Sequence, residues 1–366
     1  MIIKNGFVYQ EDQTFQKKDL YIEAGKIVDS LRQNESQEQI DASGLYVLPG
    51  LIDIHSHGAV GFDFSDGDMD GLKKILAYEY SHGITSYCPT SMTVEKENIL
   101  QIFQNMKDWK DEDYMSHVEG INMEGPFLDT SKKGAHRAEC IIPPDMDFFQ
   151  KCNTACGGRI CLVTLAPNMN GAMDFIRELH DQVSISLGHS AADYDTAKMA
   201  LEAGANHVTH LYNAMNPLNH RSPGLIGAAA DNANCMAELI CDGIHVHESM
   251  VRAAFKLFPG RIALISDSMR ATGLEDGTYD LGGQKVTVKE RLATLENGTI
   301  AGSATNVFDC MKNAVSFGIP LEEAIAAATI NPAKSIGIFD HTGSLTPGKR
   351  ADVILLDKDL NLVKVI

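Results

Sequence analysis

Apolar and polar residues alternate along the first 48 residues of the chain. Phe7–Tyr9 is one such short run, and turns are expected at Asn5-Gly6 and Ala24-Gly25. An alternation with a period of two is typical of strands that bury one face, and asparagine and glycine suit the turns between such strands. The segment is therefore predicted to form a run of short strands rather than helices.

From about residue 50 the pattern changes. Short apolar runs alternate with longer segments in which apolar residues recur at the helical period, which predicts parallel strands joined by crossover helices. There are eight candidate strands, the number found in a (β/α)8 barrel. They are Leu51–His57, Ile84–Thr90, Val118–Glu124, Cys161–Ala166, Val183–His189, His207–Tyr212, Ala237–Asp242 and Ile262–Asp267. The helices expected between them include Met69–Ser81, Glu95–Trp109, Tyr194–Ala203 and Glu248–Leu257.

Near Asn331-Pro332-Ala333 the barrel pattern ends and residues 349–357 and 360–366 return to a strand pattern. The simplest arrangement pairs both ends of the chain. We predict an α/β protein with a (β/α)8 TIM-like barrel over residues 49–334. Residues 1–48 and 335–366 are predicted to form a small β-sandwich domain beside it.

The composition narrows the choice of partners. The chain has 366 residues, with 31 Lys and Arg against 49 Asp and Glu, which gives a net charge of −18. Such an acidic protein repels nucleic-acid phosphates and anionic membranes, so neither is expected as a partner. No signal peptide or apolar run of membrane-spanning length is evident, and the eight cysteines include no Cys-x-x-Cys pair. We expect a cytoplasmic protein with ordinary thiols.

The strongest chemical candidates fall at or near the carboxyl ends of the expected strands, where barrel enzymes assemble their sites. His55 and His57 close the first strand and project to the same side, because they are two residues apart. Convergent imidazoles suit a divalent metal, although a short His-x-His pair also arises by chance. Glu124, His189 and Asp267 end other strands, and His210 lies within strand six. Together these six residues favour a metal site over isolated core or capping residues.

Several motifs, which cover nearly the whole chain in order, resemble those of the amidohydrolase superfamily. Within it, the chain is similar to the enzymes that deacetylate N-acetylglucosamine 6-phosphate. His-x-His and the last aspartate specify only the superfamily, whereas Glu-Gly-Pro and His-Leu-Tyr-Asn-Ala-Met are more specific. The motifs are Pro-Gly-Leu-Ile-Asp-Ile-His-Ser-His-Gly (49–58), Glu-Gly-Pro-Phe (124–127), Lys-Lys-Gly-Ala-His (132–136), Leu-Gly-His-Ser (187–190), Thr-His-Leu-Tyr-Asn-Ala-Met (209–215), Asp-Gly-Ile-His (242–245), Ser-Asp (266–267) and Ala-Gly-Ser (301–303).

The resemblance implies one or two divalent metal ions per chain. Glu124 would bridge two positions, one completed by His189 and His210, the other by His55, His57 and Asp267. Zinc or iron(II) is favoured, and manganese or cobalt also suits such ligands. His207 is expected to be structural, since its odd spacing from His210 along a strand turns it to the opposite face.

The resemblance also implies catalytic and substrate-binding roles. Asp267 would accept the proton of the attacking water and His136 would hydrogen-bond the acetyl oxygen, while phosphate would meet Asn213, Ala214, Arg221 and His245. A cationic residue can reach the phosphate from a neighbouring subunit in similar proteins, which implies a homodimer with shared active sites. Gly282-Gly283 predicts a hairpin within residues 278–299 that would cover the sugar. The remaining substrate-binding candidates are Ala135, Ala301, Gly302 and Ser303.

The implied activity is hydrolysis of the acetamide of N-acetyl-D-glucosamine 6-phosphate, a linear amide, in amino-sugar breakdown or recycling. The galactosamine epimer stays open, because the configuration of one hydroxyl leaves no readable mark in the sequence. A ring-opening amidohydrolase would usually carry a lysine at strand four, and residues 161–167 contain none. A sugar-phosphate binder without catalysis would require the loss of a ligand or of Asp267, and all are present.

Overall fold

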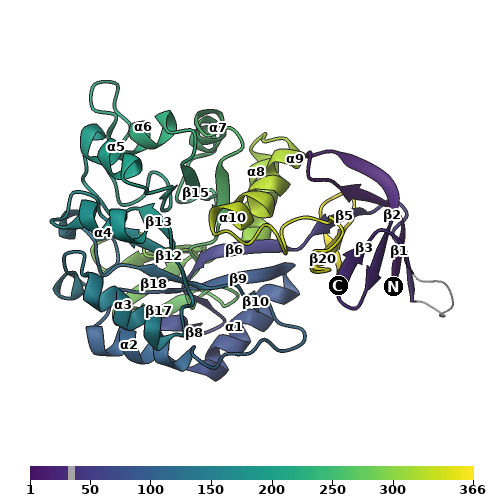
Figure 1. The fold of residues 1–366 in the computed structure, drawn as a ribbon, viewed down its shortest axis with the longest axis horizontal. Helices are drawn as coiled ribbons and strands as arrows, with labels where there is room; N and C mark the ends of the chain where they lie inside the picture. Colours follow the sequence, from purple (N-terminus) through teal and green to yellow (C-terminus); the bar gives the residue numbers. More distant parts are fainter. Residues whose placement is uncertain (32–37) are drawn as a thin grey trace.

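The structure, a computed structural model, describes residues 1–31 and 38–366; residues 32–37 of the expected 1–48 segment lie outside the described residues. Figure 1 shows a large barrel beside a small β module that contains both ends of the chain. Helices α8 (Val307–Ser316), α9 (Leu321–Ala328) and α10 (Ile330–Ser335) lie between the two parts. Within the described ranges, no helix is long and apolar enough to cross a membrane.

The barrel confirms the expected α/β class. Its eight described strands run parallel in the order β6-β9-β11-β12-β13-β14-β15-β16. They are β6 (Leu51–Ser56), β9 (Ile84–Ser91), β11 (Ile121–Glu124), β12 (Ile160–Leu165), β13 (Ser184–Leu187), β14 (His207–Val208), β15 (Met236–Ile240) and β16 (Ile262–Ile265). The outer helices before α8 are α1 (Met69–Ser81), α2 (Lys96–Asn105), α3 (Met146–Ala155), α4 (Ala172–Leu179), α5 (Tyr194–Glu202), α6 (Gly224–Asp231) and α7 (Glu248–Leu257).

No strand ladder joins β16 to β6 in the described chain, so the barrel has a seam there. Several hydrogen bonds bridge this seam. The Asp267 N–H donates to the carbonyl oxygen of His55 at 2.9 Å, and the Ser266 hydroxyl donates to Asp53 Oδ2 at 2.5 Å. The seam therefore passes directly beneath two of the candidate site residues.

Several strands end earlier than the apolar pattern predicts. β13, β14 and β16 stop before His189, His210 and Asp267, and the expectation that His210 lies within strand six is wrong. These three residues have φ values of 44°, 28° and 48°. A left-handed backbone cannot continue a strand ladder, so each side chain sits on a turn just beyond the strand. The expected strand 118–124 is also broken, into β10 (His117–Val118) and β11.

The terminal module is one continuous sheet with its own apolar core, formed by residues such as Ile3, Val47 and Val353. β5 lies between β1, from the beginning of the chain, and β20, near its end. The strands are β1 (Ile2–Tyr9), β2 (Phe15–Glu23), β3 (Lys26–Val28), β4 (Gln39–Asp41), β5 (Tyr46–Pro49), β20 (Val353–Leu356) and β21 (Leu362–Val365).

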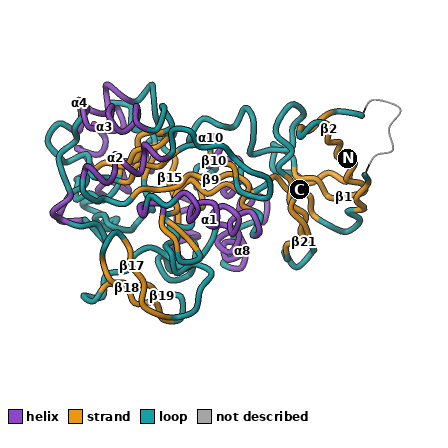
Figure 2. Tube along the Cα trace, turned by 90° about the horizontal axis from the view of Figure 1, so that it is seen from below, coloured by secondary structure: helices purple, strands orange, loops and turns teal. Residues whose placement is uncertain are grey.

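Two short insertions lie outside the barrel and the terminal module. β17 (Gly277–Leu281), β18 (Gln284–Lys289) and β19 (Leu292–Leu295) form a small antiparallel sheet, which Figure 2 shows as a lobe projecting from the barrel. Gly282 and Gly283 form the first turn with φ of 57° and 82°, as such a tight hairpin requires. β7 (Gly58–Ala59) and β8 (Phe62–Asp63) form a second, two-stranded pairing after β6.

An ion-pair network joins the terminal module to the barrel. Arg350, just before β20, donates to Glu119 Oε1 at 2.6 Å and to the Ser86 hydroxyl at 2.7 Å. Asp352 accepts from Arg350 Nε at 2.6 Å. Burial raises the pKa of Glu119, but the Arg350 charge together with hydrogen bonds from Arg350, His341 and Ser86 outweighs burial and holds that pKa below the usual range.

Arg350→Met is expected to lower the free energy of unfolding by about 2–4 kcal/mol, because it leaves the Glu119 carboxylate buried without its cation. Solvent screens part of the interaction, because 25% of the Arg350 side chain is exposed. Denaturant unfolding measures it, with Arg177→Met as control, since Arg177 pairs with Asp174 in the open and should change stability by less than ~0.5 kcal/mol.

The difference in the free energy of unfolding between the wild type and Arg350→Met should depend on pH. The folded pKa of Glu119 is lowered, so its stabilisation is complete above the unfolded pKa of about 4.5 and is lost as the pH falls through the folded value. The difference between the wild type and Arg350→Met should therefore shrink below pH ~4.5. Equal stability of the two proteins at pH 7 would mean that the network contributes nothing.

Candidate active site

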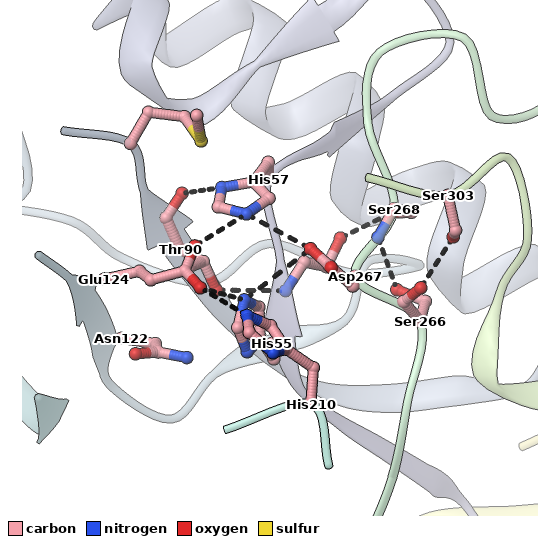
Figure 3. Close-up of polar contacts among 12 residues, drawn as sticks. His55, His57, Thr90, Asn122, Glu124, His210, Ser266, Asp267, Ser268 and Ser303 are labelled. Carbon is pink, nitrogen blue, oxygen red and sulfur yellow. Dashed lines mark hydrogen bonds and ion pairs between the residues drawn. The ribbon is translucent and has the colours of Figure 1, made fainter. Parts of the chain in front are cut away.

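Glu124 lies at the centre of the candidate site, at the end of β11. Its Oε1 is 3.1 Å from Nε2 of both His189 and His210, and its Oε2 is 3.1 Å from Nε2 of His57. Figure 3 shows His55 and His57, from the end of β6, gathered in this way with Glu124, His210 and Asp267 from other strand ends. All of them are buried. The structure thus brings the six expected metal ligands into one cluster.

Asp267 closes the other side of the cluster. Its Oδ1 is 3.3 Å from His57 Nε2 and 3.6 Å from His55 Nε2. Its turn is fixed by Ser303, which donates its N–H to the Asp267 carbonyl at 2.7 Å and its hydroxyl to the Ser266 carbonyl at 2.6 Å. The position of the carboxylate is therefore set by backbone contacts as well as by the histidines.

The hydrogen bonds at Nδ1 determine where three of these imidazoles direct a lone pair. His57 Nδ1 is 3.2 Å from the Thr90 carbonyl, His189 Nδ1 is 2.9 Å from the Lys132 carbonyl, and His55 Nδ1 is 2.8 Å from a Glu238 carboxylate oxygen. Such oxygens only accept, so each Nδ1 carries the hydrogen and each Nε2 of a neutral ring is left with a lone pair. All three lone pairs are then directed at the carboxylates.

This arrangement fits a cation. His55 Nε2 is buried and has no hydrogen-bond partner among the described residues, and the Nε2 atoms of His189 and His210 are only 2.9 Å apart. Lone pairs that face one another and two carboxylates repel unless a proton or a metal lies between them. Two groups, one with His55, His57 and Glu124 and one with Glu124, His136 and His189, have ligand atoms close enough to hold a metal.

The electrostatics agree with this interpretation. Burial alone would lower the pKa of His57, but hydrogen bonds with Asp267 and Glu124 raise it to about 10. Burial raises the pKa of Glu124, yet the surrounding imidazoles, with His55 first, hold it well below the usual range. The cluster therefore attracts positive charge strongly, and a divalent ion competes with protons for the same nitrogens.

His136 differs from the other histidines in its hydrogen bonding. Its Nδ1 accepts the backbone N–H of Thr93 at 3.2 Å, so the hydrogen of the neutral ring must lie on Nε2. That Nε2 is 3.3 Å from Glu124 Oε2. Burial lowers the pKa of His136 to about 4 despite the nearby Glu124, so the ring is neutral at pH 7. His136 is thus suited to donate a hydrogen bond rather than to bind a metal.

Gly125 explains how Glu124 reaches the centre. It has a φ of 75°, and a Cβ at this position would lie 2.2 Å from Thr93 Oγ1. Only glycine fits such a turn immediately after the carboxylate. The chain can therefore leave β11 sharply and return with the loop that carries His136.

A cavity of about 250 Å³ opens above the cluster. Its lining includes the expected residues Ala135, His136, Asn213, Ala214, His245 and Gly302. The small β17–β19 sheet also reaches this region, since Leu281 lines the cavity and Gln284 hydrogen-bonds the Ala135 carbonyl. The expected covering hairpin is thus present as part of a three-stranded sheet.

Three expected substrate-binding residues are not among the described residues that line this cavity. Ala301 is buried and Ser303 uses both its N–H and its hydroxyl to hold the Asp267 turn. Arg221 is exposed and lies beside a separate groove with Asn219 and Pro223. A phosphate in this cavity would therefore not meet Arg221 of the same chain.

Sequence reasoning missed some residues of the site. Glu238 is fully buried and contacts His55, and Met92, Thr299 and Ile300 line the cavity. A lone acidic residue inside the apolar strand Met236–Ile240 was a readable signal for Glu238. The cavity-lining residues Met92, Thr299 and Ile300 carried no such signal in the sequence. His207 lies in β14, with its Nδ1 3.1 Å from the Ser186 hydroxyl and its Nε2 unpartnered in the described chain.

A model of the amidohydrolase family matches residues 46–366. The chain belongs to the amidohydrolase family. This amidohydrolase is 39% identical over 378 aligned residues to the N-acetylglucosamine-6-phosphate deacetylase of Bacillus subtilis, which covers 100% of this chain and 95% of that one. The N-acetylgalactosamine-6-phosphate deacetylase of Escherichia coli O157:H7 is 34% identical over 322 residues, 87% of this chain and 85% of that one.

The solved structures agree. A mutant of the N-acetyl-D-glucosamine-6-phosphate deacetylase of Mycobacterium smegmatis, in complex with N-acetyl-D-glucosamine-6-phosphate, superposes with a TM-score of 0.92. The two sequences are 30% identical over 100% of this chain and 97% of that one. The resemblance of this amidohydrolase to the deacetylases, expected from its motifs, is confirmed.

Glu124→Gln is expected to lose most of the divalent metal, because a neutral amide cannot compensate cations at both oxygens. The loss in affinity should exceed the roughly 10- to 100-fold typical of outer-shell changes. Atomic spectroscopy of the purified protein measures the content. Glu79→Gln on α1 is the control, since neither Glu79 oxygen has a hydrogen-bond partner in the described residues and burial raises its pKa well above normal. A metal content equal to that of the wild type would contradict the assignment.

Proposed function

We propose that this amidohydrolase hydrolyses the acetamide of N-acetyl-D-glucosamine 6-phosphate to acetate and D-glucosamine 6-phosphate. The observation that carries the proposal is the floor of the cavity, where Glu124 and Asp267 face imidazole lone pairs and His136 adds a hydrogen-bond donor. Relatives that span the full chain bear the name of this activity. A non-catalytic sugar-phosphate binder would not need such a set of groups.

The residues that would hold divalent ions, one or two per chain, are His55, His57, Glu124, His189, His210 and Asp267. Such an ion would lower the pKa of a water molecule toward ~7 and would polarise the amide carbonyl. Asp267 is the group placed to accept the proton of the attacking water. Burial raises its pKa, but the hydrogen bond with His57 and the charge of His55 lower it to about 2, so the carboxylate is ionised and free to accept. Asp267 then gives this proton to the amine nitrogen as the C–N bond breaks.

His136 would stabilise the negative charge that develops on the acetyl oxygen. Its Nδ1 is occupied by the Thr93 N–H, so its Nε2–H is fixed as a donor. Because burial keeps the ring neutral, it can approach bound cations without adding to their repulsion. The role of His136 thus follows from the one backbone donor behind it.

The phosphate end would be held by His245 and the loop after β14. His245 Nδ1 is 2.7 Å from Asp242 Oδ2, which fixes the ring and leaves Nε2 available at the cavity. Asn213 and Ala214 line the same cavity and can offer backbone N–H groups to an anion. Arg221 would come from the second subunit of a homodimer, which agrees with its exposed position outside its own cavity.

Zinc or iron(II) is favoured at the metal positions, and manganese or cobalt also suits this ligand set. We assign the protein to the cytoplasm and divide it into the barrel of residues 49–334 and the terminal module of residues 1–48 and 335–366. N-acetylgalactosamine 6-phosphate is the second candidate substrate, because a relative at 34% identity is named for that epimer.

Asp267→Asn is expected to keep the fold but to reduce turnover of N-acetyl-D-glucosamine 6-phosphate by roughly two to four powers of ten, because an amide cannot accept the proton. Turnover is measured as acetate release, in parallel assays with the glucosamine and galactosamine epimers, and the metal content of each protein is determined. Asp193→Asn, an exposed helix cap, is the control. Near-normal turnover by Asp267→Asn would mean that Asp267 is not the general base. Faster turnover of the galactosamine epimer by the wild type would mean that the epimer is the preferred substrate.

Arg221→Ala is expected to raise KM for the 6-phosphate sugar about ten- to a hundred-fold. This is the effect of losing one charge-assisted hydrogen bond, which contributes roughly 1.5–3 kcal/mol to binding. KM for unphosphorylated N-acetylglucosamine should change little. Steady-state kinetics measure both, with Arg177→Ala as the exposed control.

Mixing Arg221→Ala chains with Asp267→Asn chains then tests the shared site. One site of each mixed dimer combines an intact Asp267 with an intact Arg221 from the other subunit, so some activity at low substrate should return. An absence of recovery in verified heterodimers would remove Arg221 from the neighbouring site.

A further inference from the structure

Glu238 is a fully buried carboxylate on β15 that lies behind the cluster and outside the cavity lining. Its Oε2 is 2.8 Å from His55 Nδ1 and accepts the backbone N–H of His210 at 3.0 Å. His55 and His210 belong to different proposed metal positions. One oxygen atom therefore contacts both halves of the site without being a ligand of either.

Glu238 determines which nitrogen of His55 carries hydrogen. An ionised carboxylate can only accept, so the hydrogen of the neutral ring stays on Nδ1 and the Nε2 lone pair remains free. This Nε2 is 3.5 Å from Glu124 Oε1 and 3.6 Å from Asp267 Oδ1, where a shared cation would lie. Without an acceptor at Nδ1 the hydrogen can move to Nε2, and a protonated Nε2 cannot bind a metal.

His55 differs from the two comparable histidines in what lies behind it. His57 and His189 direct Nδ1 to the backbone carbonyls of Thr90 and Lys132, which no substitution removes. Among these three histidines in the described structure, His55 alone depends on a side chain. The position that contains His55 is thus the one that a single residue outside the ligand set can control.

We propose that Glu238 is a positioning residue that determines whether the metal position formed by His55, His57 and Asp267 is filled. The inference rests on the metal-dependent function proposed above, but it concerns occupancy and not turnover. The position formed by Glu124, His189 and His210 should still fill, because Glu238 contacts His210 only at its backbone N–H and at no ligand nitrogen. This amidohydrolase therefore holds two metals while the Glu238 carboxylate accepts the hydrogen of His55 Nδ1, and one when that acceptor is removed.

Zinc titration of the chelator-treated full chain tests the proposal. The wild type should take up two Zn²⁺ ions. Glu238→Gln keeps an acceptor for the His210 N–H but loses the charge, so one of the two ions should bind about 10- to 100-fold more weakly. Glu238→Leu, which has no acceptor, should bind one ion. Glu79→Gln, an equally buried carboxylate change on α1, should bind both like the wild type.

Thermal melts of the metal-free proteins separate positioning from folding. Glu238→Gln should melt within a few degrees of the wild type while its second zinc site is weakened. Unchanged affinity for both ions in Glu238→Gln, a parallel loss of both ions, or a wild type that binds one ion would each overturn the proposal. If Glu238→Gln weakens only one zinc site but the wild type shows no deacetylase activity, the proposed function is wrong and this inference still holds.

Discussion

The free-energy cost of burying one carboxylate, that of Glu124, explains the arrangement of side chains at the carboxyl ends of the barrel strands. Glu124 is 2% exposed, and the Nε2 atoms of five imidazoles lie within 3.5 Å of its oxygens. A buried anion without partners costs several kcal/mol, so the surroundings must supply protons or cations. Histidines serve both purposes, because they carry a proton when no metal is present and a lone pair when one is bound. The clustering of strand ends around Glu124 follows from that requirement.

The contacts behind each imidazole divide the histidines into two kinds. Where Nδ1 meets an acceptor, as in His55, His57 and His189, the inner nitrogen offers a lone pair. Where Nδ1 meets a backbone N–H, as in His136, the inner nitrogen offers a hydrogen. Chemically identical side chains thus acquire opposite roles at the same carboxylate. The difference is set by main-chain atoms at His57, His189 and His136, and by the Glu238 side chain at His55.

Much of this arrangement was readable in the sequence. The alternation of apolar runs predicted the parallel barrel, and the position of His55, Glu124 and Asp267 at strand ends predicted that they would meet. The left-handed turns at His189, His210 and Asp267 were not predicted, because the apolar pattern does not show at which residue a ladder stops. Glu238 was missed because its importance lies in a partner 183 residues away in the sequence. Periodicity reports local structure, whereas such contacts depend on the closed fold.

The pairing of β5 has a consequence for how the protein is made. β5 lies between β1 and β20, and Val353 is aligned with Pro49 across nearly the whole chain. During synthesis the first strands emerge long before β20 exists, so one side of β5 stays an open edge while the barrel is translated. Open edges favour pairing with other chains, and contacts between distant residues form slowly. β20 thus closes, late in synthesis, the module that β1 and β5 begin.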